Sequence, residues 1–206
     1  MNATKMAVVL VVFSVFARGV ACGFDSDDMS ALQTIFLSCR HRGGPMPFDD
    51  LRHYAEAEAL SDKEMSAMLL DFVRNGMEEN ADKRQQRMGL SALGALSMFG
   101  GEEERCVVLD IMRTTSSMDF RVHAIKTCIR MMPGQWEEVV REVATGDRYG
   151  NYEHFSAYEE AFHVGENSDA RTKERIEQVM EELAEREASQ ANQERLQRWA
   201  NELKAR

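Results

Sequence analysis

The segment from Met118 to Gly146, MDFRVHAIKTCIRMMPGQWEEVVREVATG, predicts two amphipathic helices separated by Pro133 and Gly134. Pro133 cannot continue a helix and Gly134 tolerates a left-handed exit, so the first helix ends there and a second begins. Each helix places its apolar residues on one face, because they recur every three or four positions. These residues are Val122, Ile125, Cys128, Ile129 and Met132 in the first helix, and Trp136, Val139, Val140 and Val143 in the second. We therefore expect an antiparallel hairpin that must bury both faces against other helices.

The opposite faces of this hairpin are charged. Arg121, Lys126 and Arg130 lie away from the first apolar stripe, and acidic residues lie away from the second. We expect these side chains to point to water.

A related pattern lies 35 residues upstream, where Leu90 aligns with Ile125 and Leu93 aligns with Cys128. Both segments open with an aspartate that is followed two residues later by an arginine, and both end in glycine. After Gly100-Gly101 a second apolar-periodic run follows, formed by Cys106, Val107, Leu109 and Met112. The repetition indicates that the hairpin is a structural unit.

Over residues 82–146 this pattern resembles the HEAT-like family of helical repeats. The resemblance implies an α-solenoid of stacked hairpins with a concave binding surface, and it supplies no catalytic residue to carry over. An irregular helical bundle shares most of the pattern. The fold class expected is all-α in either case.

Composition supports a single helical domain over residues 25–186. The 206 residues include only three prolines and 14 methionines, and Leu, Ala, Glu and Arg are abundant helix formers. Further helices are expected from Ser26, near Phe48, and after the capping-box pattern of Ser61 and Glu64, the last ending at Asn75-Gly76. The formal charge of −10 argues against nucleic acid as a partner, because nucleic-acid binding needs a basic patch.

The N-terminus predicts a secretory signal peptide at residues 1–21. The apolar run from Met6 to Ala17 is too short to span a bilayer, which takes about 20 residues. Gly19-Val20-Ala21-Cys22 resembles a bacterial lipobox, which implies lipidation of Cys22, although Gly19 replaces the usual leucine and Arg18 interrupts the apolar run. We expect export to the cell envelope, as a periplasmic protein or as a lipoprotein whose only membrane contact is the lipid. An uncleaved leader is the remaining alternative.

Two of the cysteines could form a disulfide or remain free thiols. Cys106 and Cys128 fall on inferred core faces of neighbouring helices, so a disulfide is conceivable, and two buried free thiols are the favoured alternative. Cys39 is the remaining cysteine if Cys22 is lipidated. The absence of a Cys-x-x-Cys motif argues against redox chemistry and structural zinc, and we expect no cofactor.

The most aromatic stretch follows Gly146 and is a candidate recognition patch at Tyr149, Tyr152 and His154, since aromatic residues with polar ends are favoured at interfaces. Phe155, Tyr158 and Phe162 lie at helical spacing, which favours a role in the core. Glu160 and His163 match Glu-x-x-His, a spacing found in di-iron bundles. Because the rest of such a site is missing, a metal-dependent enzyme is only the alternative hypothesis.

The last 20 residues form a separate apolar stripe of Leu196, Trp199 and Leu203. Ile176 opens the preceding stripe 20 residues before Leu196, so one straight helix would rotate the second stripe about 200° from the first. We therefore expect a helix break near Ser189 to Asn192, and a flexible or partner-binding extension at residues 187–206. Together the patterns predict a non-catalytic protein-interaction scaffold of the cell envelope, which recognises a protein partner by its concave face or by this extension.

Overall fold

The computed structural model describes residues 26–38, 48–131 and 134–205, and in these ranges all regular structure is helical. The all-α prediction is confirmed. The predicted signal peptide and the residues Cys22, Cys39, Met132 and Pro133 lie outside the described residues. Within the described ranges, every helix is too short or too polar to cross a lipid bilayer. In chain order the helices are α2 (Ser26–Ser38), α3 (Phe48–Ala57), α4 (Asp62–Met77), α5 (Lys83–Phe99), α6 (Glu102–Thr114), α7 (Met118–Met131), α8 (Trp136–Thr145), α9 (Asn151–Glu166), α10 (Ala170–Ala184) and α11 (Gln190–Lys204).

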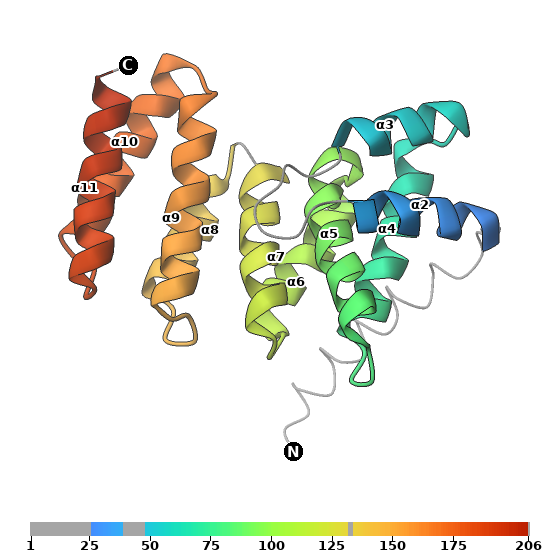
Figure 1. The fold of residues 1–206 in the computed structure, drawn as a ribbon. Coiled ribbons are helices and arrows are strands. Elements are labelled where there is room, and N and C mark those ends of the chain that lie inside the picture. The colour runs from blue at the N-terminus through green and yellow to red at the C-terminus, as the bar shows by residue number, and fades with distance from the viewer. Residues whose placement is uncertain (1–25, 39–47, 132–133, 206) are drawn as a thin grey trace.

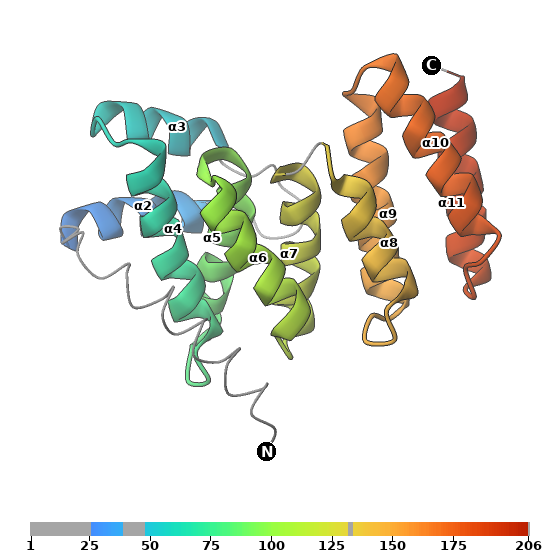
Figure 2. The ribbon, with the colours of Figure 1, turned by 180° about the vertical axis from the view of Figure 1, so that it is seen from behind.

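The helices from α4 onward form a two-layer, solenoid-like stack. Figure 1 shows α5, α7, α9 and α11 side by side in one layer, and Figure 2 shows α4, α6, α8 and α10 in the layer behind it. Successive helices run in opposite directions, so their connecting loops alternate between the two ends of the stack. At the N-terminal side, α2 packs on α5 and α3.

Helix α7 is the centre of this stack. It packs on α5 and α9 within its own layer and on α6 behind it, and each of these contacts is more extensive than its contact with α8. The predicted hairpin of α7 and α8 is therefore only one, and the smallest, of the four packings that bury α7. Because neighbours surround it, α7 buries residues on most of its circumference, namely Phe120, Val122, Ala124, Ile125, Thr127, Cys128 and Ile129.

Local capping explains where two of the helices begin. Ser61 and Glu64 form the predicted capping box of α4, with Ser61 N–H donating to Glu64 Oε2 at 2.8 Å and Glu64 N–H donating to Ser61 Oγ at 3.3 Å. Asp82 and Gln85 form the same reciprocal pair at the start of α5. These boxes satisfy backbone donors that would otherwise lack a partner at a helix start.

The predicted end of α4 at Asn75-Gly76 is one residue early, because the helix continues to Met77. Gly76 serves as a contact residue inside the helix rather than as its terminator. A Cβ on Gly76 would lie 2.9 Å from the Cα of Gly89 on α5, so the absence of a side chain lets the two helices touch.

The predicted apolar face of α6 needs correction. Its buried residues are Val108, Ile111 and Met112, whereas Cys106 is exposed. Of the predicted stripe, Met112 is buried and Val107 and Leu109 pack against the core, so only Cys106 lies off the core face. The predicted face of α8 is confirmed, since Trp136 and its three valines are all buried.

The C-terminal segment is an integral part of the domain. The predicted helix break occurs one turn earlier than expected, at residues 185–189, and α11 folds back onto α10 and α9. Leu196, Trp199 and Leu203 are buried in the same hydrophobic core as the preceding helices. The expectation of a separate, flexible extension at 187–206 is therefore corrected.

Candidate interaction surface

The basic side chains of α7 meet acidic side chains of α9. Three ion pairs join the two helices: Arg121 Nε to Glu153 Oε1 at 2.9 Å, Lys126 Nζ to Glu159 Oε2 at 2.6 Å, and Arg130 Nε to Glu160 Oε1 at 2.5 Å. The expectation that the three bases of α7 point to water is therefore wrong for Arg121 and Lys126, which are half-buried, whereas Arg130 is exposed as well as paired. The back layer is joined in the same way by Arg113 with Glu142, and by Glu137 with Arg175. These pairs tie successive helices together.

The predicted metal-site residues are separated by these contacts. Both carboxylate oxygens of Glu160 accept hydrogen bonds from Arg130, whereas His163 Nδ1 lies 3.0 Å from Glu166 Oε2 at the surface. Nowhere in the described ranges do three histidine, cysteine or acidic side chains converge as metal ligands. Glu160 thus acts as the partner of an arginine in this structure.

The three residues of the predicted recognition patch have different environments. Tyr149 is buried, His154 is half-buried, and only Tyr152 is strongly exposed, at 55%. The structure therefore leaves Tyr152 as the one member of this patch that is open to a partner. Phe155, Tyr158 and Phe162 belong to or pack against the core, as their spacing predicted.

His154 instead belongs to a polar cluster that closes the turn between α10 and α11. Tyr158 donates its hydroxyl to Glu187 Oε2 at 2.7 Å, His154 Nδ1 lies 3.2 Å from the same oxygen, and Ser189 N–H donates to Glu187 Oε1 at 3.1 Å. Burial would raise the pKa of Glu187, but these hydrogen bonds bring that pKa below its ordinary value. Burial also raises the pKa of the Tyr158 hydroxyl. The burial of Glu187 could not be predicted from the sequence, because this residue lies in a polar segment among charged residues.

The predicted partner-binding stripe of the C-terminus is occupied by the protein itself. The Trp199 ring stacks on Phe162 at 5.4 Å between centroids and lies 5.9 Å from Phe155. Leu196 and Leu203 are also buried. These three side chains are core residues here, and the hypothesis that they face a partner is corrected.

The two described thiols are free. Cys128 is buried, and burial raises the pKa of its thiol to about 12, so it behaves as a small apolar residue. Cys106 is exposed, contrary to the expectation of two buried thiols, and it forms no bridge with Cys128.

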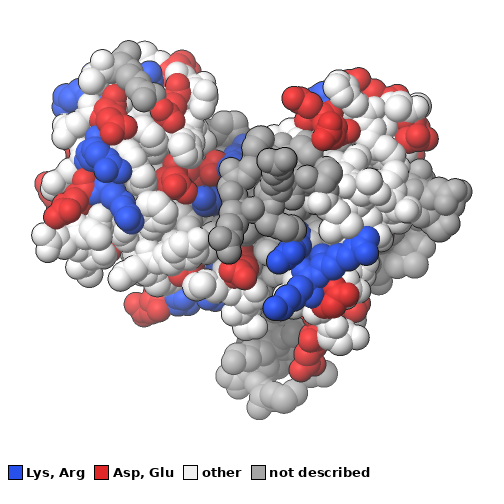
Figure 3. All heavy atoms as spheres, viewed as in Figure 1, with Lys and Arg blue, Asp and Glu red and all other residues white. Residues whose placement is uncertain are grey.

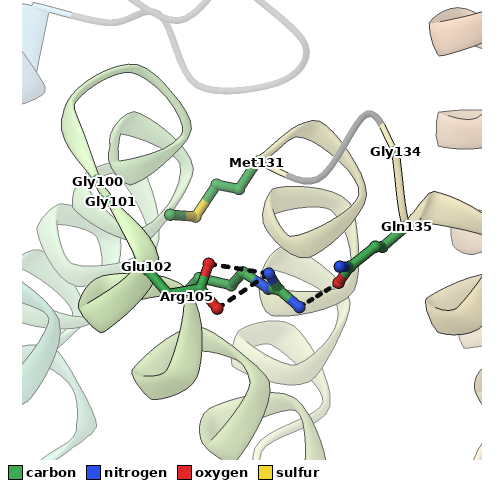
Figure 4. A pocket seen from close by; sticks show the side chains of 7 residues that line it. All are labelled: Gly100, Gly101, Glu102, Arg105, Met131, Gly134 and Gln135. Carbon is green, nitrogen blue, oxygen red and sulfur yellow. Dashed lines mark hydrogen bonds and ion pairs between the residues drawn. The ribbon is translucent and has the colours of Figure 1, made fainter.

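One cavity of about 300 Å³ lies at the glycine-rich end of the stack, between the α5–α6 and α7–α8 connections. Figure 4 shows Arg105 across it, bonded to Glu102 on its own helix and to Gln135 on the other side. Since Glu102 neutralises the arginine, the cavity offers no free charge to an anionic ligand. We interpret it as a gap left where the α5–α6 and α7–α8 connections pack against each other.

Exposed apolar side chains gather at the opposite end of the stack. In the described residues the large hydrophobics that are exposed are Leu37, Met77, Met118 and Tyr152. Met77 ends α4, Met118 begins α7 and Tyr152 lies in the first turn of α9, so all three lie where the loops α4–α5, α6–α7 and α8–α9 connect the layers (Figure 1). We call this surface the loop edge and define it by Met77, Met118 and Tyr152.

A second cavity, of about 180 Å³, opens within the loop edge. Its walls come from the end of α4, the first half of α5 and the start of α7. The lining residues are Gly76, Met77, Glu78, Gln86, Leu90, Thr115, Ser116, Ser117, Asp119 and Phe120. Sequence reasoning missed this site, and Met77 and Met118 could have been noticed only as apolar residues just outside the predicted helical stripes.

The broad face formed by α5, α7, α9 and α11 is less distinctive. Figure 3 shows Lys and Arg side chains gathered over α5, whose exposed bases are Lys83, Arg84 and Arg87, and a mixture of acids and bases over α9 and α11. Much of that charge is already paired between helices, which favours the loop edge as the candidate interaction surface.

The sequence matches no protein-family model, and no curated protein or solved structure shows significant similarity to it. The resemblance to HEAT-like repeats therefore remains a prediction that rests on the residues of α5 to α8.

Proposed function

We propose that this protein is a non-catalytic interaction scaffold of the cell envelope, and that it binds a protein partner through the loop edge. The observation that carries the proposal is the location of exposed apolar side chains. Met77, Met118 and Tyr152 lie at one end of the stack, and Met118 and Tyr152 are 49% and 55% exposed. Large apolar side chains gathered on an otherwise charged surface are typical of protein-binding sites.

The stack is suited to such a role because its charges hold it together. Ion pairs join α7 to α9 and α8 to α10, and we expect them to restrain the relative motion of these helices. A rigid surface loses little conformational entropy on binding, which favours affinity. The envelope location rests on the predicted signal peptide and Cys22.

Capture from the native envelope fraction tests the function. The wild-type protein is compared with a Met118→Ser/Tyr152→Ser variant, which removes exposed apolar area from the loop edge without touching the core. Leu37→Ser is the matched control, because Leu37 is also exposed but lies on α2, away from the loop edge. We expect the double variant to lose its specific partner while melting normally, and the control to retain it. Equal capture by all three proteins would contradict the proposal.

A further inference from the structure

The cavity of the loop edge is of a size that suits one side chain. Sites for small molecules usually have volumes of about 300–1,000 Å³, whereas this cavity has about 180 Å³. Met77 lines it, and the exposed Met118 lies between the lining residues Ser117 and Asp119. Anchoring side chains of a protein partner commonly fill such pockets among apolar neighbours.

The inner wall of the cavity is apolar. Phe120 is buried and Leu90 is half-buried, and both pack in the core beneath the opening. Gly76 adds bare backbone, since Gly89 and the Phe120 ring occupy the space where a side chain would lie. The inner wall is therefore suited to the aliphatic stem of a long side chain.

The rim of the cavity is negative. Glu78 and Asp119 are exposed, and no ion pair is recorded for either carboxylate within the described part of the chain. Arg121 pairs with Glu153, and both Arg121 and Arg148 donate to the carbonyl oxygen of Thr115, which lines the cavity, but neither arginine side chain itself lines it. Lys83 and Arg84 begin α5 but do not line the cavity.

Backbone and amide groups also favour a cation in the cavity. The C-terminal end of α4 forms part of the wall, and helix C-termini favour cations. Gln86 donates its amide to the Ala81 carbonyl, which leaves its side-chain oxygen as an acceptor. The N-terminus of α7 favours an anion, but Asp119 already lies in its first turn.

We propose that the cavity receives a lysine or arginine side chain of the partner, with an apolar residue beside it that contacts Met77 and Met118. Lysine and arginine place an aliphatic stem along apolar surface and keep the charged end in a polar rim, which is the arrangement of this cavity. An acidic side chain would be repelled by Glu78 and Asp119. The inference rests on the proposed function, because it describes the partner of the same surface.

The preference of the cavity for a lysine or arginine side chain is tested by using the protein to select binders from an immobilised library of random hexapeptides. We expect the selected peptides to carry lysine or arginine next to leucine, methionine or phenylalanine. For one selected peptide, measured by fluorescence polarisation, Glu78→Gln/Asp119→Asn should weaken binding about 3- to 10-fold, which is the size of two partly exposed charge pairs. Added salt should weaken binding to the wild-type protein more than to this variant.

Glu103→Gln/Glu138→Gln is the matched control, because these two acids are also exposed but lie on α6 and α8 outside the cavity. It should bind as the wild-type protein does. Selected peptides without basic residues, or equal binding by the cavity variant, would overturn the lysine or arginine inference. If those peptides still depend on Met118 and Tyr152, the proposed function survives. Failure to select any peptide, together with unchanged capture by the Met118→Ser/Tyr152→Ser variant, would count against both.

Discussion

Gly76 of α4 and Gly89 of α5 form a contact in which a Cβ on either residue would lie about 3 Å or less from backbone atoms of the other helix. The Phe120 ring lies against both glycines. A Cβ on either residue would therefore meet backbone atoms as well as this ring, and moving one side chain would not make room for it. This contact lies directly behind the cavity of the loop edge and holds α4, α5 and α7 together.

Gly89→Ala should therefore destabilise the protein by about 1–3 kcal/mol, as overpacking does, although alanine favours a helix more than glycine by about 1 kcal/mol. Gly134→Ala is the matched control, because a Cβ there meets no atom within 4 Å. Urea unfolding of both variants measures the difference. A Gly89→Ala variant as stable as the control would show that the two helices are farther apart.

Glu160→Gln should lower the free energy of unfolding by about 1.5–3 kcal/mol, because Glu160 is only 4% exposed and accepts two hydrogen bonds from Arg130. The same change at Glu159, whose pair with Lys126 is about 30% exposed at each end, should cost at most about 1 kcal/mol. A double-mutant cycle with Arg130→Gln isolates the pair energy. Similar small losses for both glutamates would mean that the pair of Glu160 is solvated.

The purified protein should contain no stoichiometric iron, manganese or zinc, because Arg130 occupies both oxygens of Glu160 and His163 pairs with Glu166. Elemental analysis by mass spectrometry measures this directly. Stoichiometric metal that is lost in Glu160→Gln or His163→Ala would restore the metal-dependent enzyme as the better hypothesis.

Trp199→Ala should destabilise the protein by about 3–5 kcal/mol, as expected when a large buried aromatic is removed. Cutting the chain after Leu183 should likewise lower the melting temperature, since it exposes Phe162 and the core residues of α9 and α10. Thermal melts and tryptophan fluorescence measure both effects. Normal melting of the truncated chain would return α11 to the role of a separate partner-binding segment.

Stability should fall when the pH drops below about 4.3, the ordinary pKa of a glutamate carboxyl. Hydrogen bonds from Arg175 and Arg141 hold the pKa of Glu137 below its ordinary value, and a bond from Arg113 does the same for Glu142. A carboxylate with a lowered folded-state pKa stabilises the protein above its unfolded pKa of about 4.3, and this contribution is lost as the pH falls through the folded value.

Glu137→Gln should consequently melt at a lower temperature than the wild-type protein at pH 7 and lose less stability between pH 6 and pH 3.5. Glu138→Gln should follow the wild-type curve, because Glu138 is exposed and no ion pair is recorded for it in the described ranges. Parallel pH profiles for all three proteins would show that the Glu137 contacts contribute nothing.

Local sequence determined the helices of this protein, because their signals lie within one turn of where they act. The boxes of Ser61 with Glu64 and of Asp82 with Gln85 mark two helix starts. The apolar spacing of α8 identified its buried face, and that of α7 identified part of the surface that α7 buries. Sequence also indicated that the chain must break before α11, because the stripe of Trp199 is out of phase with that of Ile176.

Only the tertiary structure decided which helix lies beside which, because that choice depends on contacts between residues about 30 or more positions apart. The sequence pattern predicted that Arg130 points to water, but α9 places Glu160, 30 residues further along the chain, within hydrogen-bond distance of it. The sequence pattern placed Trp199 on a partner-binding stripe, but α11 folds back and stacks the Trp199 ring on Phe162. Met77 and Met118 became neighbours of one cavity because antiparallel helices return to the same end of the stack, a relation that no local pattern of side chains contains.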